Sequence, residues 1–460
     1  MESFWDFSVW SGFHLIAVLL LGLLAANVLR RSIPFLKSSL IPSSVLGGGV
    51  LIVVAEIYKL ITGQGMFDTP FFGGNGTAQL EILTYHCLAL GFISSTFKPA
   101  KGKLTRQRTT EIFNTGVTTV STYLLQGVFG LAISLIAARI VSGFFPAAGI
   151  LLPFGYGQGT GQALNYGGIF ENEYGFVGGK SFGLTIAALG FLCASIGGVI
   201  HLNILKKQGK IALQSEQKQG LRSEQIEAED EIPMQESIDK LTVQIALIAA
   251  AYFLTYFIMS GLGRLLPGMR SVIFGFNFLI GVLSATLIKL FMSFLKKKGV
   301  IQKEHINSFL MTRTSNFFFD LMVVAGIAAI RFGVLERYWG IILIMGAVGM
   351  VITYIYNHFV AKKLFGDYAE AQFLMMYGML TGTASTGVIL LRELDGDFKT
   401  PAADNMVYQN FPAIVFGFPM MLLATMAPKK TILTLLILIG FFAVMNVILF
   451  RSFIFQKRKK

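Results

Sequence analysis

Two glycine-rich segments hold the residues of this sequence best suited to bind a solute. Residues 153–165 read PFGYGQGTGQALN, and residues 377–387 read YGMLTGTASTG. Glycine lets the backbone turn and approach a ligand, while the N-termini of broken helices attract anions. Carbonyl groups at the broken ends and Thr or Ser hydroxyls are the hard oxygen ligands that Na⁺ requires. The predicted substrate-binding residues are Gln158, Gly159, Thr160, Gly161, Thr383, Ser385 and Thr386.

The two segments can be superimposed, since QGTG at 158–161 matches TGTA at 381–384. Interrupted segments at matched positions in two halves of a chain point to the binding site of a transporter. A nucleotide-binding loop is excluded, because Thr160 occupies the third glycine position of the dinucleotide motif and no Lys-Ser/Thr pair follows. Close helix packing through small residues four apart, and a plain loop, stay open as alternatives.

Asp320 lies inside an apolar segment. A charged side chain at this depth costs about 2.5–3.5 kcal/mol, so a partner or a function should offset that cost. A coupling-ion or proton role and a structural pair are both open, and Asn316 lies one helical turn away. The predicted Na⁺ ligands are Thr381, Asn316 and Asp320. We expect no other cofactor and no enzymatic activity, because the sequence has neither His-Glu-x-x-His nor Gly-x-Ser-x-Gly.

These residues lie in a chain whose composition is that of a membrane protein. Of its 460 residues, 54% are apolar and only 14% are charged, and the mean hydropathy is +0.65. A soluble domain needs far more charge on its surface. The net charge of +13 does not indicate nucleic acid as a partner, because the basic residues cluster at the ends of apolar runs.

Eleven apolar runs are long enough to span a bilayer, which takes about 20 residues. They are 8–29, 43–61, 79–97, 113–137, 180–205, 242–263, 272–295, 307–330, 338–361, 405–427 and 431–450. Two more apolar segments, 143–168 and 369–393, are interrupted by Gly and Thr. Irregular backbone at membrane depth survives only where protein or a water-filled cavity satisfies its polar groups, so both are predicted to be re-entrant hairpins.

The order of these segments predicts an all-α polytopic protein made of two inverted repeats. The first repeat is 1–206 and the second is 242–428, each with five spans and one hairpin. A polar cytoplasmic linker at 207–241 separates them, and a C-terminal helix with a basic tail occupies 429–460. Because each repeat has an odd number of spans, the second starts from the opposite side of the membrane.

The basic residues predict an orientation with the N-terminus outside and the C-terminus in the cytoplasm. The predicted inner loops are rich in Lys and Arg, as the positive-inside rule requires. Trp5, Trp10 and Trp339 fall at predicted outer ends of helices, where an aromatic belt would place them. The expected location is the inner (plasma) membrane.

The hairpin motif resembles that of the glutamate:sodium symporter family of bacteria. GQGTGQA at 157–163 is similar to the family's GGHGTGAA, with Gln158 where the family has His, and IPSSVLGG at 41–48 is similar to its entry to the second span. Asn316 is similar to an Asn in the corresponding helix, whereas TAST at 383–386 departs from the family's ATPT. The resemblance implies Na⁺-coupled uptake of an acidic amino acid, a homodimer, and a mobile domain that carries the hairpins against a scaffold.

The sequence therefore predicts a secondary transporter for glutamate or a related amino acid or carboxylate, which works by an elevator mechanism. Its expected partners are a small anionic substrate, Na⁺, the lipid bilayer and a second copy of the chain. A passive channel, which can also be built from re-entrant loops, is one alternative. An H⁺-coupled carrier of a different small anion is the other.

Overall fold

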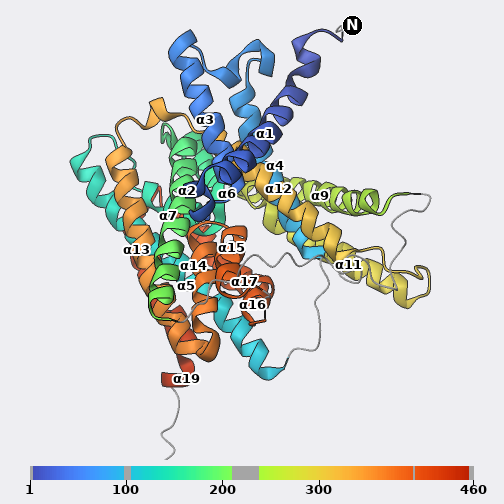
Figure 1. The fold of residues 1–460 in the computed structure, drawn as a ribbon, viewed down its shortest axis with the longest axis vertical. Helices are drawn as coiled ribbons and strands as arrows, with labels where there is room; N and C mark the ends of the chain where they lie inside the picture. Colours follow the sequence, from blue (N-terminus) through green and yellow to red (C-terminus); the bar gives the residue numbers. More distant parts are fainter. Residues whose placement is uncertain (1–3, 98–104, 210–237, 397–398, 455–460) are drawn as a thin grey trace, which may run out of the picture. The chain divides into compact units, whose positions relative to one another are not determined.

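The structure is a computed structural model that describes residues 4–97, 105–209, 238–396 and 399–454. Over these residues the chain forms α-helices and short 3₁₀ helices and contains no strand (Figure 1). Most of the expected linker and the basic C-terminal tail lie outside the described residues. The linker is bounded by helices that end at Lys207 and begin at Lys240.

Nine helices in the described part of the chain are long and apolar enough to cross a bilayer. This confirms an all-α polytopic membrane protein at the level of its class. The nine are α1 (Phe7–Ser32), α3 (Ser43–Thr62), α4 (Gly76–Phe97), α5 (Arg106–Ile140), α7 (Gly179–Lys207), α9 (Lys240–Leu265), α11 (Asn277–Lys297), α13 (Trp339–Leu364) and α18 (Thr431–Leu449).

The expected count of eleven spans exceeds the nine helices in two places. The segment expected at 307–330 forms α12 (Ser308–Ala328), where Arg313, Asn316 and Asp320 interrupt the apolar sequence. The segment expected at 405–427 divides into α16 (Ala402–Tyr408) and α17 (Asn410–Met426), which meet at a bend of 54°. If this bent pair counts as one span, ten helices meet the length and hydropathy requirement.

The chain divides into two compact units that do not coincide with the two halves of the sequence. Unit 1 comprises Met1–Leu80, Lys103–Gln214 and Val324–Lys460, and unit 2 comprises Glu81–Gly102 and Ser215–Val323. Each unit therefore combines segments from both predicted repeats. Short helices within these segments are α2 (Pro34–Ser38), α10 (Arg270–Gly275) and α19 (Arg451–Ile454).

In unit 2, α4 packs closely against the first part of α12. A Cβ atom on Gly91 would lie 2.6 Å from the ring of Phe319, so only glycine fits at this position of α4. The Ser315 hydroxyl donates to the Gly91 carbonyl over 2.9 Å. Ile93, Ile248 and other buried apolar side chains complete the core of this unit.

In unit 1 the predicted first hairpin folds back on itself within α6 (Leu151–Tyr174). The helix is broken at Gly159, whose φ of 77° and ψ of −169° lie in a region open only to glycine. The rings of Phe154 and Tyr166 stack with centroids 4.0 Å apart. Twelve residues of continuous helix would separate them by about 18 Å. The two arms therefore run antiparallel, with the turn at Gly159.

The second hairpin consists of α14 (Ala369–Thr381) and α15 (Ala384–Leu394), which lie side by side in Figure 1. A Cβ atom on Gly378 would lie 2.7 Å from the Cα atom of Gly387, so the two arms touch backbone to backbone. The helix breaks at Gly382. Thr383 then caps α15, because its hydroxyl accepts from the Thr386 amide.

Candidate functional site

The site is built around α5 and α13, which run antiparallel in unit 1. Asn357 of α13 donates to the Thr122 hydroxyl over 3.3 Å, and Gln126 donates to the Thr353 hydroxyl over 2.8 Å. Residue numbers thus rise along α5 as they fall along α13. Since the first hairpin follows the end of α5 and the second follows the end of α13, the hairpins start from opposite ends of this helix pair.

The first hairpin follows α5 from its C-terminal part towards its middle. A Cβ atom on Gly149 would lie 1.8 Å from the Gly130 carbonyl oxygen, so the backbones touch there. Further along, the Tyr123 hydroxyl donates to the Gly157 carbonyl over 3.0 Å. The first arm therefore descends along α5 and brings its tip to Tyr123.

The second hairpin follows α5 from the other end. Near its base, Gln372 donates to the Thr115 hydroxyl over 3.2 Å. Near its tip, Gln126 donates to the Leu380 carbonyl over 2.9 Å. The two tips therefore contact positions 123 and 126 of α5, which lie within a single helical turn.

Contacts with α7 also show that the two hairpin tips lie close together. The first hairpin touches this helix at Gly183, where a Cβ atom would lie 2.4 Å from the Ala163 carbonyl oxygen. At Gly190 both hairpins converge, because a Cβ atom there would lie 2.4 Å from the Thr381 carbonyl oxygen and 2.9 Å from the Tyr156 ring. Any side chain at position 190 would push the two hairpins away from α7.

The broken helices give the tips a defined electrostatic character. The second arm of each hairpin begins at its tip, so two helix N-termini point their partial positive charge into the same region. The first arm of each hairpin ends there, which leaves carbonyl oxygens at the tip. Neither 157–161 nor 381–386 contains a charged side chain. The tips can therefore attract an anion through backbone amides and a small cation through carbonyl and hydroxyl oxygens.

The structure brings together the predicted substrate residues of both hairpins. Thr160 is fully buried and packs against α12, because a Cβ atom on Gly326 would lie 2.7 Å from the Thr160 Cβ. Thr381 is fully buried, and its hydroxyl donates to the Tyr377 carbonyl. Gly159, Gly161 and Thr386 are also buried, while Gln158, Thr383 and Ser385 are partly exposed.

The other two predicted Na⁺ ligands lie in a different unit. Asn316, which is exposed, and Asp320, which is half-buried, belong to the part of α12 in unit 2. Thr381 belongs to unit 1. A joint ion site of these three residues stays a prediction.

Sequence reasoning missed three residues of the site. Tyr123 and Gln126 of α5 contact the two tips, and Gln162 lies in the first hairpin close to its tip. Gln126 and Gln162 are buried, and the Gln126 Oε1 and Gln162 Nε2 atoms have no hydrogen-bond partner among the described residues. A buried amide atom without a partner costs about 1–3 kcal/mol, so each is expected to gain one from a ligand or water.

Gln162 lies inside the first glycine-rich segment, 153–165, but was not among the predicted site residues. The only signal for Tyr123 and Gln126 in the sequence was the run of polar residues at 114–126. That signal is ambiguous, since the Thr118 hydroxyl donates to the Asn114 carbonyl and the Thr122 hydroxyl to the Thr118 carbonyl. Such bonds satisfy the hydroxyls within their own helix and need no ligand.

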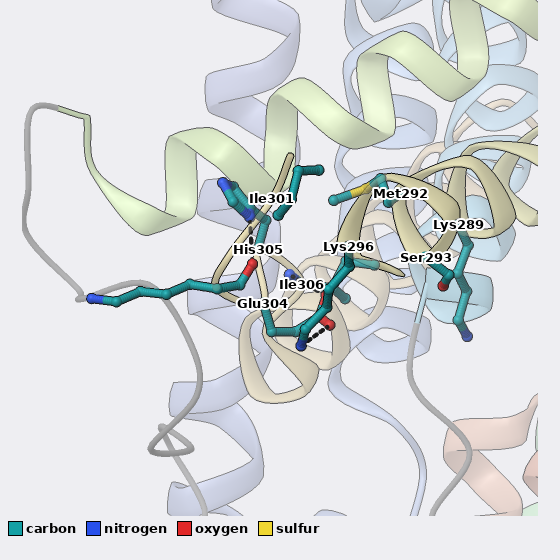
Figure 2. Close-up of a pocket in the computed structure, with 9 residues that line it drawn as sticks. Lys289, Met292, Ser293, Lys296, Ile301, Glu304, His305 and Ile306 are labelled. Atoms are coloured by element: carbon teal, nitrogen blue, oxygen red, sulfur yellow. Dashed lines mark hydrogen bonds and ion pairs between the residues drawn. The ribbon is translucent and has the colours of Figure 1, made fainter. Parts of the chain in front are cut away.

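A small pocket in unit 2 does not compete with this site. Figure 2 shows Lys296 reaching across it to Glu304, and the two side chains form an ion pair at 3.3 Å. The cavity measures about 20 Å³, which is room for one water molecule. It is too small for an organic substrate.

No protein-family model matches this chain, and no curated protein matches it. Its function is therefore inferred from the geometry of the two hairpins.

Proposed function

We propose that the protein is a secondary active transporter that couples Na⁺ entry to uptake of glutamate or a related amino acid or carboxylate. The observation that carries this proposal is the meeting of two glycine-broken hairpin tips, from opposite ends, at Tyr123 and Gln126 of α5. Broken helices whose ends converge at mid-membrane are the general design for binding an anionic substrate together with its coupling ion.

The polarity of the tips favours a small substrate that carries a carboxylate. Two helix N-termini direct backbone amides and partial positive charge towards an anionic group, and the Gln162 Nε2 atom is a buried donor close to the first tip. The carbonyls and hydroxyls of the first arms, including those of Thr381, offer oxygen ligands to Na⁺. The proposed substrate residues remain Gln158, Gly159, Thr160, Gly161, Thr383, Ser385 and Thr386, to which we add Gln126 and Gln162.

Alternating access by an elevator motion and an inverted-repeat topology belong to the same proposal. Apart from short helices, each half of the chain has the same order of elements: three helices, a fourth helix (α5 or α13), a hairpin, and a further helical segment. The antiparallel packing of α5 and α13 is what inverted repeats require. The proposed setting is the plasma membrane, with the N-terminus outside, the C-terminus in the cytoplasm and the protein a homodimer.

The test is uptake by the purified protein reconstituted in proteoliposomes, with a panel of amino acids and carboxylates. We expect saturable accumulation of one acidic substrate that requires an inward Na⁺ gradient. Rapid, non-saturable equilibration without accumulation would replace the carrier with a passive channel. Accumulation driven by a proton gradient alone would replace Na⁺ with H⁺.

Asp320 gives a sharper comparison between Na⁺ and H⁺ coupling. If its carboxylate carries the coupling proton, the Asp320→Asn variant should lose the pH dependence of transport and retain only substrate exchange. If Na⁺ is the coupling ion and Asp320 is one of its ligands, this variant should need a higher Na⁺ concentration for uptake and keep the pH dependence of the wild type. Uptake measured from pH 5 to 8 at several Na⁺ concentrations distinguishes the two.

A further inference from the structure

The base of the second hairpin carries a cluster of two histidines and a glutamate that the proposed transport site does not use. His201 lies near the end of α7, His358 near the end of α13, and Glu370 in the first turn of α14. All three belong to unit 1. Their nitrogen and carboxylate ligand atoms lie within 4.8 Å of one another.

We propose that His201, His358 and Glu370 bind a divalent transition metal of the Zn²⁺ type. Two histidines and one carboxylate, with one position left open to water, form a common zinc ligand set. Metal–ligand bonds of this type set tetrahedral ligand atoms about 3.4 Å apart. The Glu370 Oε2 atom lies 3.0 Å from the His201 Nε2 atom and 3.9 Å from the His358 Nε2 atom, which brackets that spacing.

Tyr354 orients the first histidine for this role. Its hydroxyl lies 2.7 Å from the His201 Nδ1 atom. If Nδ1–H donates to this hydroxyl, the lone pair of Nε2 faces Glu370 and is free to bind a metal. Hydrogen bonds of this kind from the second ring nitrogen fix the orientation of metal-binding histidines.

The burial of the cluster allows a metal to enter from one side. The His201 side chain is 3% exposed, whereas those of His358 and Glu370 are 28% and 23% exposed. The His201 ring also packs against Phe373 of α14, with centroids 4.4 Å apart. A bound water would complete the metal's ligands on the exposed side, while the ring of Phe373 packs against His201 on the buried side.

A bound metal would tie the base of the second hairpin to α7 and α13. Because its ligands come from three different helices, the metal should stabilise the fold of unit 1. Lys362 lies one helical turn after His358 on α13, so its positive charge opposes a cation at this site. Removing its charge with Lys362→Gln should therefore tighten metal binding.

The experiment is titration of the full-length, metal-free protein in detergent with Co²⁺ and Zn²⁺. We expect one Co²⁺ per chain with the intense visible absorption of a tetrahedral site, displacement of Co²⁺ by Zn²⁺, and a higher melting temperature with Zn²⁺. Glu370→Gln and His358→Ala should each abolish the absorption. Tyr354→Phe should weaken binding about 10- to 100-fold, as removal of a hydrogen-bond partner from a metal ligand does.

His305→Ala is the matched control, because His305 is a half-buried histidine that lies in unit 2, outside this cluster. It should leave binding unchanged. The melting temperature without metal shows that each variant is folded. Absence of a saturable Co²⁺ spectrum in the wild type would overturn the proposal and leave a hydrogen-bonded cluster. Binding of Co²⁺ by Glu370→Gln and His358→Ala as tightly as by the wild type would overturn it as well.

Discussion

The hydroxyls of Thr160 and Thr383 lie at the tips of two different hairpins and are the sharpest targets for substitution. Thr160→Val keeps the shape that packs against Gly326 and removes only the hydroxyl. Thr383→Val also removes the cap of α15, which costs about 1 kcal/mol. We expect both variants to insert in the membrane and to lose coupled uptake, measured in proteoliposomes.

Thr383→Ser serves as the control for the second tip, since serine retains both the hydroxyl and the cap. It should transport with kinetics close to those of the wild type. Normal uptake by both valine variants would remove these two hydroxyls from the site.

Gln126 is expected to matter for stability as well as for transport. Its side-chain amide donates to Thr353 and to the Leu380 carbonyl, and the residue is fully buried. Gln126→Leu leaves the Leu380 carbonyl without this donor, which should lower the free energy of unfolding by about 1–3 kcal/mol. The melting temperature in detergent should fall, and uptake should be lost.

Gln107→Leu is the matched control on the same helix, because Gln107 is exposed and its side chain donates to Glu111, four residues away on the same helix. Its melting temperature should stay close to that of the wild type. Equal melting temperatures for Gln126→Leu and Gln107→Leu would show that the hydrogen bond from Gln126 to the Leu380 carbonyl contributes nothing to stability.

At the residue level, the sequence predicted the broken tips but not the side chains of α5 that bind them. Gly159 could be recognised because glycine repeats at 155, 157, 159 and 161 make a continuous helix unfavourable. Gln126 could not be recognised, because its partner Leu380 lies 254 residues away and polar residues on α5 are also typical of helix packing.

At the level of elements, the second hairpin depends on a glycine–glycine contact between its arms. A Cβ atom on Gly387 would lie 2.4 Å from the Met375 carbonyl oxygen. Backbone cannot move aside as a flexible side chain can, so Gly387→Ala should force the arms apart at a cost of about 1–3 kcal/mol. The melting temperature should fall and uptake should decrease.

Gly440→Ala of α18 is the control, since a Cβ atom there meets nothing within 4 Å. Alanine is the better helix former, so this variant should melt at or slightly above the wild-type temperature. If Gly387→Ala melted as high as Gly440→Ala, the arms would have room to separate and the close contact would not hold the hairpin together.

Two apolar runs that were expected to form single spans, 405–427 and 307–330, contain residues that change the outcome. The apolar run at 405–427 predicted one span, but Pro412 at the start of α17 cannot donate a helical hydrogen bond, and the helix bends by 54° nearby. The run at 307–330 is helical as expected. Its charged and amide side chains make it less apolar than the nine long helices.

For the whole molecule, the decisive prediction is that the two hairpins enter the membrane from opposite sides. Residues near the two bases can report this, namely exposed Asn172 at the end of α6 and exposed Glu393 at the end of α15. We expect an Asn172→Cys variant to react with a membrane-impermeant maleimide from outside the cell. A Glu393→Cys variant should react only after the membrane is permeabilised.

Both variants need a background without the native thiols of Cys87 and Cys193, made with Cys87→Ala and Cys193→Ser. Serine at 193 keeps a partner for the Tyr156 hydroxyl, which lies 3.2 Å from the Cys193 sulfur. The antiparallel packing of α5 and α13 requires the two bases to lie at opposite ends of this helix pair. Labelling of both positions from the same side would therefore mean that the pair does not cross the membrane, and the proposed transport site would lose its access from the two sides.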